Sequence, residues 1–207
     1  AVFRKGAKIM KKMLLHYYEQ GLASWLLFTP LVASFFALPL LFEGAEMAAY
    51  LILSISITAL CAVYLDQREN QLVMTSLFPI SRKTFFIVDL SFLGRYTLYY
   101  ILYTIVATTA IQTLLEKQLV LPSVRQLLVS FAISFFIIVF FLLFRRSKFG
   151  QMINFSIFLI PLGLSQLLVF LGSLSTFQSF SLFMSLLILL IIAASITYFR
   201  EFRRDVP

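Results

Sequence analysis

The chain has 207 residues, of which 61% are hydrophobic and only 13% charged, and its formal net charge is +8. Soluble domains are about 45–50% apolar and about 25% charged, so this composition excludes an ordinary water-soluble protein. The bases fall in short clusters between apolar runs, which argues against a nucleic-acid partner and favours cytoplasmic loops. We therefore expect a single-domain, all-α integral membrane protein with about six spans of roughly 20 residues each.

The first segment, residues 1–20, combines basic and apolar side chains at imperfect helical spacing. Such a helix lies in the membrane interface, with its apolar side in lipid and its lysines toward anionic headgroups. An ordinary cytoplasmic tail is the alternative. The bases of this segment are Arg4, Lys5, Lys8, Lys11 and Lys12.

Six apolar runs follow, and each predicts one transmembrane helix. The first contains Pro30 and Pro39, which predict a kink or an early end, and the fifth is interrupted by Pro161 and Gly163. The predicted spans are residues 24–42, 47–64, 96–115, 126–144, 152–171 and 180–199.

The third run begins with residues 84–95, which contain Asp89 and Arg95. We expect this part to lie at the membrane interface, where long charged side chains reach water. Arg82 lies seven residues before Asp89, so a continuous helix would bring the two to one face. A structural ion pair is expected there, and a proton relay is the alternative.

The distribution of the bases predicts the orientation of the chain. Every Lys and Arg except Lys117 and Arg125 falls on one side of the predicted bundle. The positive-inside rule therefore places both termini in the cytoplasm and requires an even number of spans.

A polar stripe runs along the third predicted span at three- and four-residue spacing, and so lies on one helical face. It either lines a conduit or a helix interface, or consists of threonines that satisfy their own helix backbone and a tyrosine anchored at the interface. The stripe consists of Thr97, Tyr100, Thr104, Thr108 and Gln112.

The residues of an enzyme are missing from the sequence. His16 is the only histidine and Cys61 the only cysteine, and the seven glycines are too dispersed for a phosphate-binding loop. We expect no catalytic, metal or cofactor site on this chain, so any ATP would be bound by another subunit.

Residues 66–83 follow the second predicted span and carry the most informative motif. An acidic residue, Glu69, precedes Ser76-Leu77-Phe78-Pro79-Ile80-Ser81-Arg82-Lys83. The order resembles the first cytoplasmic loop of bacterial ABC exporter permeases of the second (ABC-2) type, with Phe78 inserted and with Asp89 where a lysine is more usual. Residues 147–150 (SKFG) and 195–204 (SITYFREFRR) are similar to two further motifs of the small permeases of that family, including exporters of phenol-soluble modulins and bacteriocins.

The resemblance implies a permease subunit in the bacterial cytoplasmic membrane that exports an amphipathic peptide, a lipid-like molecule or a drug. Two permease chains, identical or paralogous, would sit on two ATP-binding subunits that hold ATP and Mg. Residues 1–20 would be the elbow helix. A short coupling helix around Glu69–Leu77 would dock into a groove on the ATPase, with apolar anchors and a polar rim. The apolar anchors are Leu72, Val73, Met74 and Leu77, and the polar rim consists of Arg68 and Glu69.

Two other classes stay open. A secondary transporter or channel would need a charge at the membrane midplane or a broken helix, for which the sequence offers only the break at Pro161 and Gly163. A non-transporting membrane scaffold would leave residues 66–83 as a plain connector that binds nothing.

Overall fold

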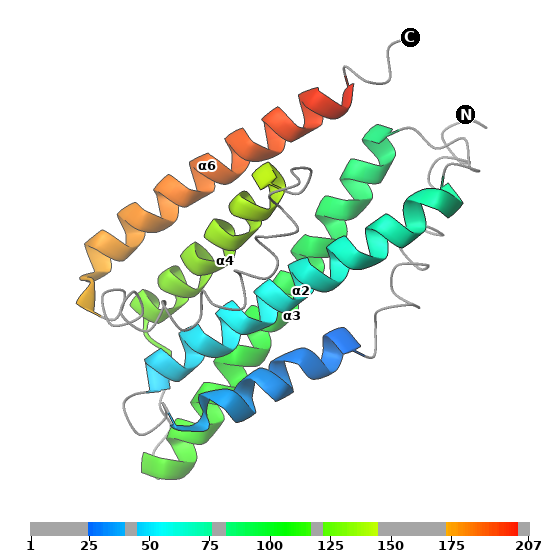
Figure 1. Ribbon diagram of the computed structural model, residues 1–207. Coiled ribbons are helices and arrows are strands. Elements are labelled where there is room, and N and C mark those ends of the chain that lie inside the picture. The colour runs from blue at the N-terminus through cyan, green and yellow to red at the C-terminus, as the bar shows by residue number, and fades with distance from the viewer. Residues whose placement is uncertain (1–24, 40–44, 76–81, 117–121, 145–172, 203–207) are drawn as a thin grey trace, which may run out of the picture.

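The computed structural model describes residues 25–39, 45–75, 82–116, 122–144 and 173–202, and within these ranges the protein is helical and contains no strand. The predicted elbow helix and fifth span lie outside the described residues, as do Leu77 and the basic segment after residue 144. The described helices are Trp25–Ala37, α2 (Ala45–Thr75), α3 (Arg82–Glu116), α4 (Val124–Phe144) and α6 (Thr176–Phe202) (Figure 1).

Three of these helices are long and apolar enough to cross a membrane: Phe86–Leu114 of α3, Val124–Leu143 of α4 and Thr176–Phe199 of α6. Two shorter apolar helices, Trp25–Ala37 and Glu46–Ala62, lie beside them. An all-helical fold with three such helices confirms the coarse expectation from composition and is compatible with a membrane protein.

The helices lie side by side, with α2, α4 and α6 running in one direction and α3 in the opposite direction, as their contacts show. Tyr64, far along α2, contacts Phe92 near the start of α3 with ring centroids 6.0 Å apart, so α2 and α3 are antiparallel. The same Tyr64 ring contacts Phe141 near the end of α4 at 5.7 Å, while Glu46 and Arg125 pair at the starts of these helices, so α2 and α4 are parallel. Helices α4 and α6 also run in the same direction and form the most extensive contact among the labelled helices (Figure 1).

The starts of α4 and α6 are fixed by the same short motif, a serine followed three residues later by glutamine. At α6 the Ser175 N–H donates to Gln178 Oε1 at 2.9 Å, and the Gln178 N–H donates to Ser175 Oγ at 3.3 Å. At α4 the Gln126 N–H donates to Ser123 Oγ at 3.1 Å. Such capping satisfies N–H groups that the first helical turn leaves without a partner, so it sets where each helix begins.

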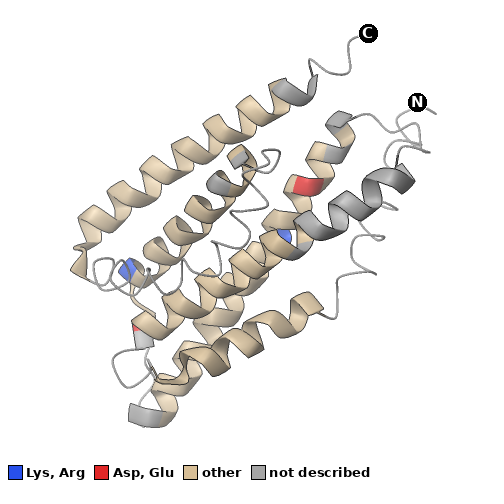
Figure 2. Cartoon of the chain, viewed as in Figure 1, with Lys and Arg blue, Asp and Glu red and all other residues tan. Residues whose placement is uncertain are grey.

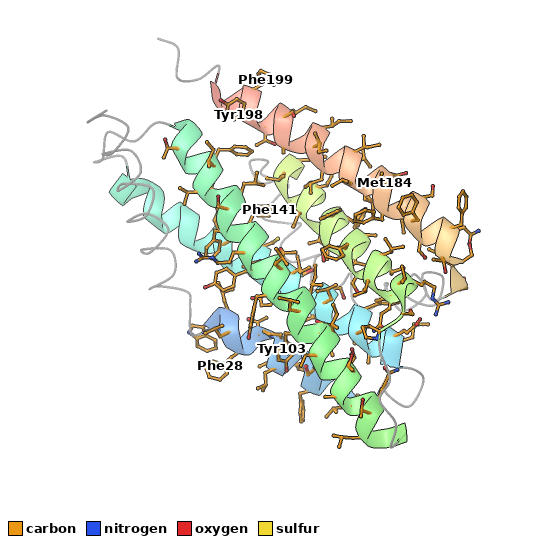
Figure 3. All side chains as sticks on the ribbon, turned by 180° about the vertical axis from the view of Figure 1, so that it is seen from behind. Phe28, Tyr103, Phe141, Met184, Tyr198 and Phe199 are labelled. Atoms are coloured by element: carbon orange, nitrogen blue, oxygen red, sulfur yellow. The ribbon has the colours of Figure 1, made fainter. Side chains whose placement is uncertain are left out.

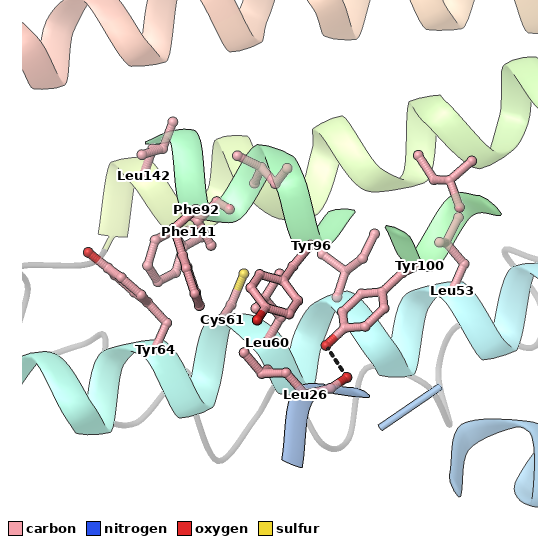
Figure 4. Close-up of a cluster of buried hydrophobic side chains, with 14 of the residues drawn as sticks. Leu26, Leu53, Leu60, Cys61, Tyr64, Phe92, Tyr96, Tyr100, Phe141 and Leu142 are labelled. Atoms are coloured by element: carbon pink, nitrogen blue, oxygen red, sulfur yellow. Dashed lines mark hydrogen bonds between the residues drawn. The ribbon is translucent and has the colours of Figure 1, made fainter. Parts of the chain in front are cut away.

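The largest buried cluster joins α2, α3 and α4 with the Trp25–Ala37 helix. Tyr64 lies between Phe92 and Phe141, and Leu60 and the buried Cys61 fill the next turn of α2 (Figure 4). In this position Cys61 is a small buried side chain that fills space in the cluster.

The outer surface of the bundle is apolar, the reverse of a soluble protein. Large hydrophobic side chains project outward from α6 and from the Trp25–Ala37 helix, among them Phe28, Met184 and Phe199 (Figure 3). Phe199 is 62% exposed and Trp25 is 76% exposed. Contiguous apolar surface on this scale needs a lipid or protein partner, and a lipid environment also explains the composition.

Two boundaries differ from the sequence-based expectation. Helix α2 continues from the predicted end of its span at Tyr64 through to Thr75, so residues 66–75 extend the span instead of forming a separate short helix after a loop. Helix α3 is unbroken from Arg82 to Glu116, so no boundary divides an interfacial part at residues 84–95 from a span that begins at residue 96. In α2, residues 65–75 contain neither glycine nor proline, so the helix continues where hydropathy falls. In α3 the single Gly94 does not end the helix, because one isolated glycine inside a helix is tolerated at a cost of about 1 kcal/mol.

The first predicted span ends early, at Ala37, and a short 3₁₀ stretch follows over residues 38–39. Pro39 explains this end, because the residue before a proline avoids helical geometry. Pro30, by contrast, lies inside the helix.

Candidate functional site

The predicted polar stripe of α3 lies mainly in the interior of the bundle. Thr97 is 5% exposed, Tyr100 is fully buried, and Thr104 and Thr108 are each 1% exposed, while Gln112 is half-buried. Tyr100 packs in the same cluster as Leu26 and Leu53, so this face of α3 contacts both the first helix and α2.

Tyr100 also makes the polar contact that joins α3 to the first helix. Its hydroxyl donates to the backbone carbonyl of Leu26 at 3.0 Å (Figure 4). That carbonyl would normally accept the N–H of residue 30, but Pro30 has no N–H to give. The tyrosine therefore supplies, from another helix, the hydrogen bond that the proline removes.

The threonines of the stripe divide into two kinds. Thr108 Oγ1 donates to the Thr104 carbonyl at 2.7 Å, which satisfies the hydroxyl within its own helix. Thr97 Oγ1 and Thr104 Oγ1 are buried and have no hydrogen-bond partner within the described part of the chain. A buried hydroxyl without a partner costs free energy, so these two positions are the least satisfied part of the stripe.

An ion pair that was not predicted from the sequence joins the starts of α2 and α4. Arg125 Nη2 contacts Glu46 Oε2, and Ser123 Oγ lies 3.4 Å from Glu46 Oε1. Both charged side chains are about a third exposed, so the pair mainly orients the helix starts. Glu46 also offsets the unfavourable position of Arg125 at a helix N-terminus. The sequence contained a signal for this pair, because Glu46 and Arg125 both lie at loops that are predicted on the same side of the membrane.

The start of α6 lies beside this ion pair. Leu174, Ser175 and Thr176 line an open depression together with Glu46, Ser123 and Arg125. Three helix starts that the sequence assigns to one side of the bundle therefore meet at one end.

Charge is sparse over the rest of the bundle. Among residues whose side chains the structure describes, the charged ones are Glu46, Asp89, Arg95 and Arg125 (Figure 2). Asp89 is 2% exposed, whereas Arg95 is exposed, so the two lie on different faces of α3. The described residues also contain no group of three side chains that could hold a metal ion. The Arg82 side chain, and with it the predicted pair with Asp89, lies outside the described residues.

The predicted coupling residues Arg68, Glu69, Leu72, Val73 and Met74 lie in the C-terminal part of α2. Their backbone is helical, and their side chains lie outside the described residues, as does all of Leu77.

Comparison with protein-family models, with curated proteins and with solved structures finds no match to this chain. Within the described residues, the fold and the composition define a helical protein with three helices that are long and apolar enough to cross a membrane.

Proposed function

We propose that the chain is the permease subunit of an ATP-driven ABC exporter of the second type. In this proposal six spans cross the bacterial cytoplasmic membrane, both termini are cytoplasmic, and residues 1–20 form the elbow helix. Two permease chains work with two ATP-binding subunits, which hold ATP and Mg. The exported molecule is an amphipathic peptide, a lipid-like molecule or a drug.

The observation that carries the proposal is the length of α2. Its 31 residues correspond to about 46 Å at about 1.5 Å per residue, whereas a hydrocarbon core is about 30 Å thick. The apolar part is Glu46–Ala62, so the surplus is at the C-terminal end, where the chain reads Asp66-Gln67-Arg68-Glu69-Asn70-Gln71. A polar helical extension that is continuous with a span can transmit a movement of a cytoplasmic subunit directly to that span.

The packing of α2 supports a lever action for this extension. Tyr64 anchors the helix between Phe92 of α3 and Phe141 of α4, two residues before the polar segment begins. Because the helix is unbroken, a force on residues 66–75 acts on these two contacts directly, without a loop that could absorb it. A coupling helix joined to its span by a loop would transmit less of the motion.

The directions of the described helices support the six-span part of the proposal. Helices α2, α4 and α6 begin together at one end of the bundle, and α3 runs the other way. If the chain between α4 and α6 crosses the membrane once, α4 and α6 must run in the same direction, as they do. The bundle end opposite the Glu46–Arg125 pair is then the cytoplasmic end.

The test is purification of the full chain from its native membrane together with the ATPase activity that accompanies it. We expect a subunit with a phosphate-binding loop in the complex, and we expect Met74→Asp to reduce its recovery at least tenfold, because a carboxylate would enter an apolar groove.

The matched control is Gln71→Glu, which adds the same charge at a polar position of the same helical segment and should leave recovery within twofold. Undiminished recovery with Met74→Asp would remove the coupling assignment, and purification of the intact chain without any ATPase subunit would contradict the exporter proposal.

A further inference from the structure

Leu174 precedes the cap of α6 and packs away from its own helix. Ser175 and Gln178 form the reciprocal cap, so Leu174 is the residue directly before the N-cap. An apolar residue in that place often packs on an apolar residue at the fourth helical position, but here this position is Ser179. Leu174 instead belongs to a buried cluster with three residues of α2 and α4. They are Tyr50, Val129 and Ile133.

Leu174 is also the point at which this cluster meets the open depression between the three helix starts. The depression has a volume of about 450 Å³, and of the four residues of the cluster Leu174 lines it. Leu174 is 9% exposed, whereas Tyr50 and Val129 are 0% exposed. The Leu174 side chain therefore lies between the depression and the rest of the cluster.

The Tyr50 side chain points toward the same end of the bundle. It lies about one helical turn after Glu46, and side chains on a helix lean toward the helix N-terminus. The hydroxyl is close enough to Glu46 and Arg125 to interact electrostatically with both charges. It is nevertheless buried and has no hydrogen-bond partner within the described part of the chain. Water from the depression would satisfy this hydroxyl if Leu174 left the cluster.

We propose that Leu174 is a removable plug, which seals this end of the bundle in the structure and leaves the cluster in a second, open state. The two states are close in free energy because two opposing effects are similar in size. Burial of a leucine side chain favours the sealed state by a factor of about 10–150. A buried hydroxyl without a partner, here that of Tyr50, favours the open state by a factor of about 5–150. The partly exposed Glu46–Arg125 pair holds the starts of α2 and α4 together and favours the sealed state by at most about fivefold. The inference is independent of the proposed exporter function, because it involves no ATPase subunit.

The test is the rate at which a charged methanethiosulfonate reagent modifies Val129→Cys in the detergent-solubilised full chain, in a Cys61→Ala background. The reagent stays in water, so this rate reports how often the buried cluster opens to the depression. Leu174→Ala should raise the rate at least tenfold, and Glu46→Gln should raise it about two- to fivefold. Tyr50→Phe should lower the rate about fivefold, because the open state no longer gains a hydrated hydroxyl.

Leu182→Ala is the matched control, because Leu182 packs against the same cluster from α6 and does not line the depression. It should change the rate less than twofold. A rise as large as that in Leu174→Ala would show a general loosening of the cluster and overturn the plug, as would an unchanged rate in Leu174→Ala. Tyr50→Phe keeps the buried ring, so it decides the question even if Leu174→Ala does not fold. A Tyr50→Phe rate equal to or above that of the parent chain would contradict the proposal.

Discussion

Tyr100→Ala should lower the free energy of unfolding by about 2–4 kcal/mol, because it empties a fully buried aromatic site between three helices. The range starts below that of soluble cores, since lipid solvates apolar side chains well and mainly packing is lost. Tyr100→Phe keeps the ring and removes only the donor to the Leu26 carbonyl, so about 1–2 kcal/mol is expected. Thermal unfolding in detergent measures both changes.

A double-mutant cycle isolates the reason for the Tyr100→Phe effect. Pro30→Ala restores an N–H four residues after Leu26, and the first helix can then satisfy that carbonyl itself. We expect Tyr100→Phe to cost about 1 kcal/mol less in the Pro30→Ala background than in the wild type. Equal costs in the two backgrounds would show that the tyrosine does not replace the hydrogen bond lost at Pro30.

Ser134→Asp should prevent α4 from inserting and packing. Ser134 is fully buried and lies at the midpoint of α4. A carboxylate at the centre of a membrane-spanning helix costs roughly 2.5–3.5 kcal/mol for insertion alone. The expected result is loss of folded protein from the membrane fraction, measured by size-exclusion chromatography of solubilised membranes.

Ser134→Ala is the control for this position. The serine hydroxyl donates to the Ser130 carbonyl of the same helix at 2.8 Å, so its removal breaks no contact between helices. The alanine variant should be within about 0.5 kcal/mol of the wild type. A folded and abundant Ser134→Asp protein would show that the middle of α4 is open to water.

Hydropathy predicts the described helices well where the apolar run has sharp ends. Residues 126–144 were expected as a span and α4 is Val124–Phe144, and residues 180–199 were expected where α6 is Thr176–Phe202. The small differences come from the serine–glutamine caps, which start each helix a few residues before its apolar run. Hydropathy reflects the free energy of transfer to lipid, whereas capping hydrogen bonds determine at which residue the helix begins.

The same measure fails where a helix leaves the apolar region. The polar residues after Tyr64 do not stop α2, because Gln, Arg and Glu extend a helix about as readily as Leu. Asp89 does not mark a boundary in α3, because one aspartate lowers helix stability by less than about 1 kcal/mol. Four of the five residues of the polar stripe of α3 are buried, and whether the stripe lines a conduit or a helix interface stays a prediction. The specific role of Tyr100 was missed, although Pro30 gave the signal, because every internal proline leaves a carbonyl without its donor four residues earlier.

The most direct test of a membrane-spanning bundle with α2, α4 and α6 starting on one side is cysteine labelling in intact cells. In a Cys61→Ala background, single cysteines replace Val124 and Thr176 at the shared end, and Thr84 near the start of α3 at the opposite end. A membrane-impermeant maleimide should label Val124→Cys and Thr176→Cys from outside. It should label Thr84→Cys only after the membrane is opened. Labelling of all three positions from the same side would contradict the account.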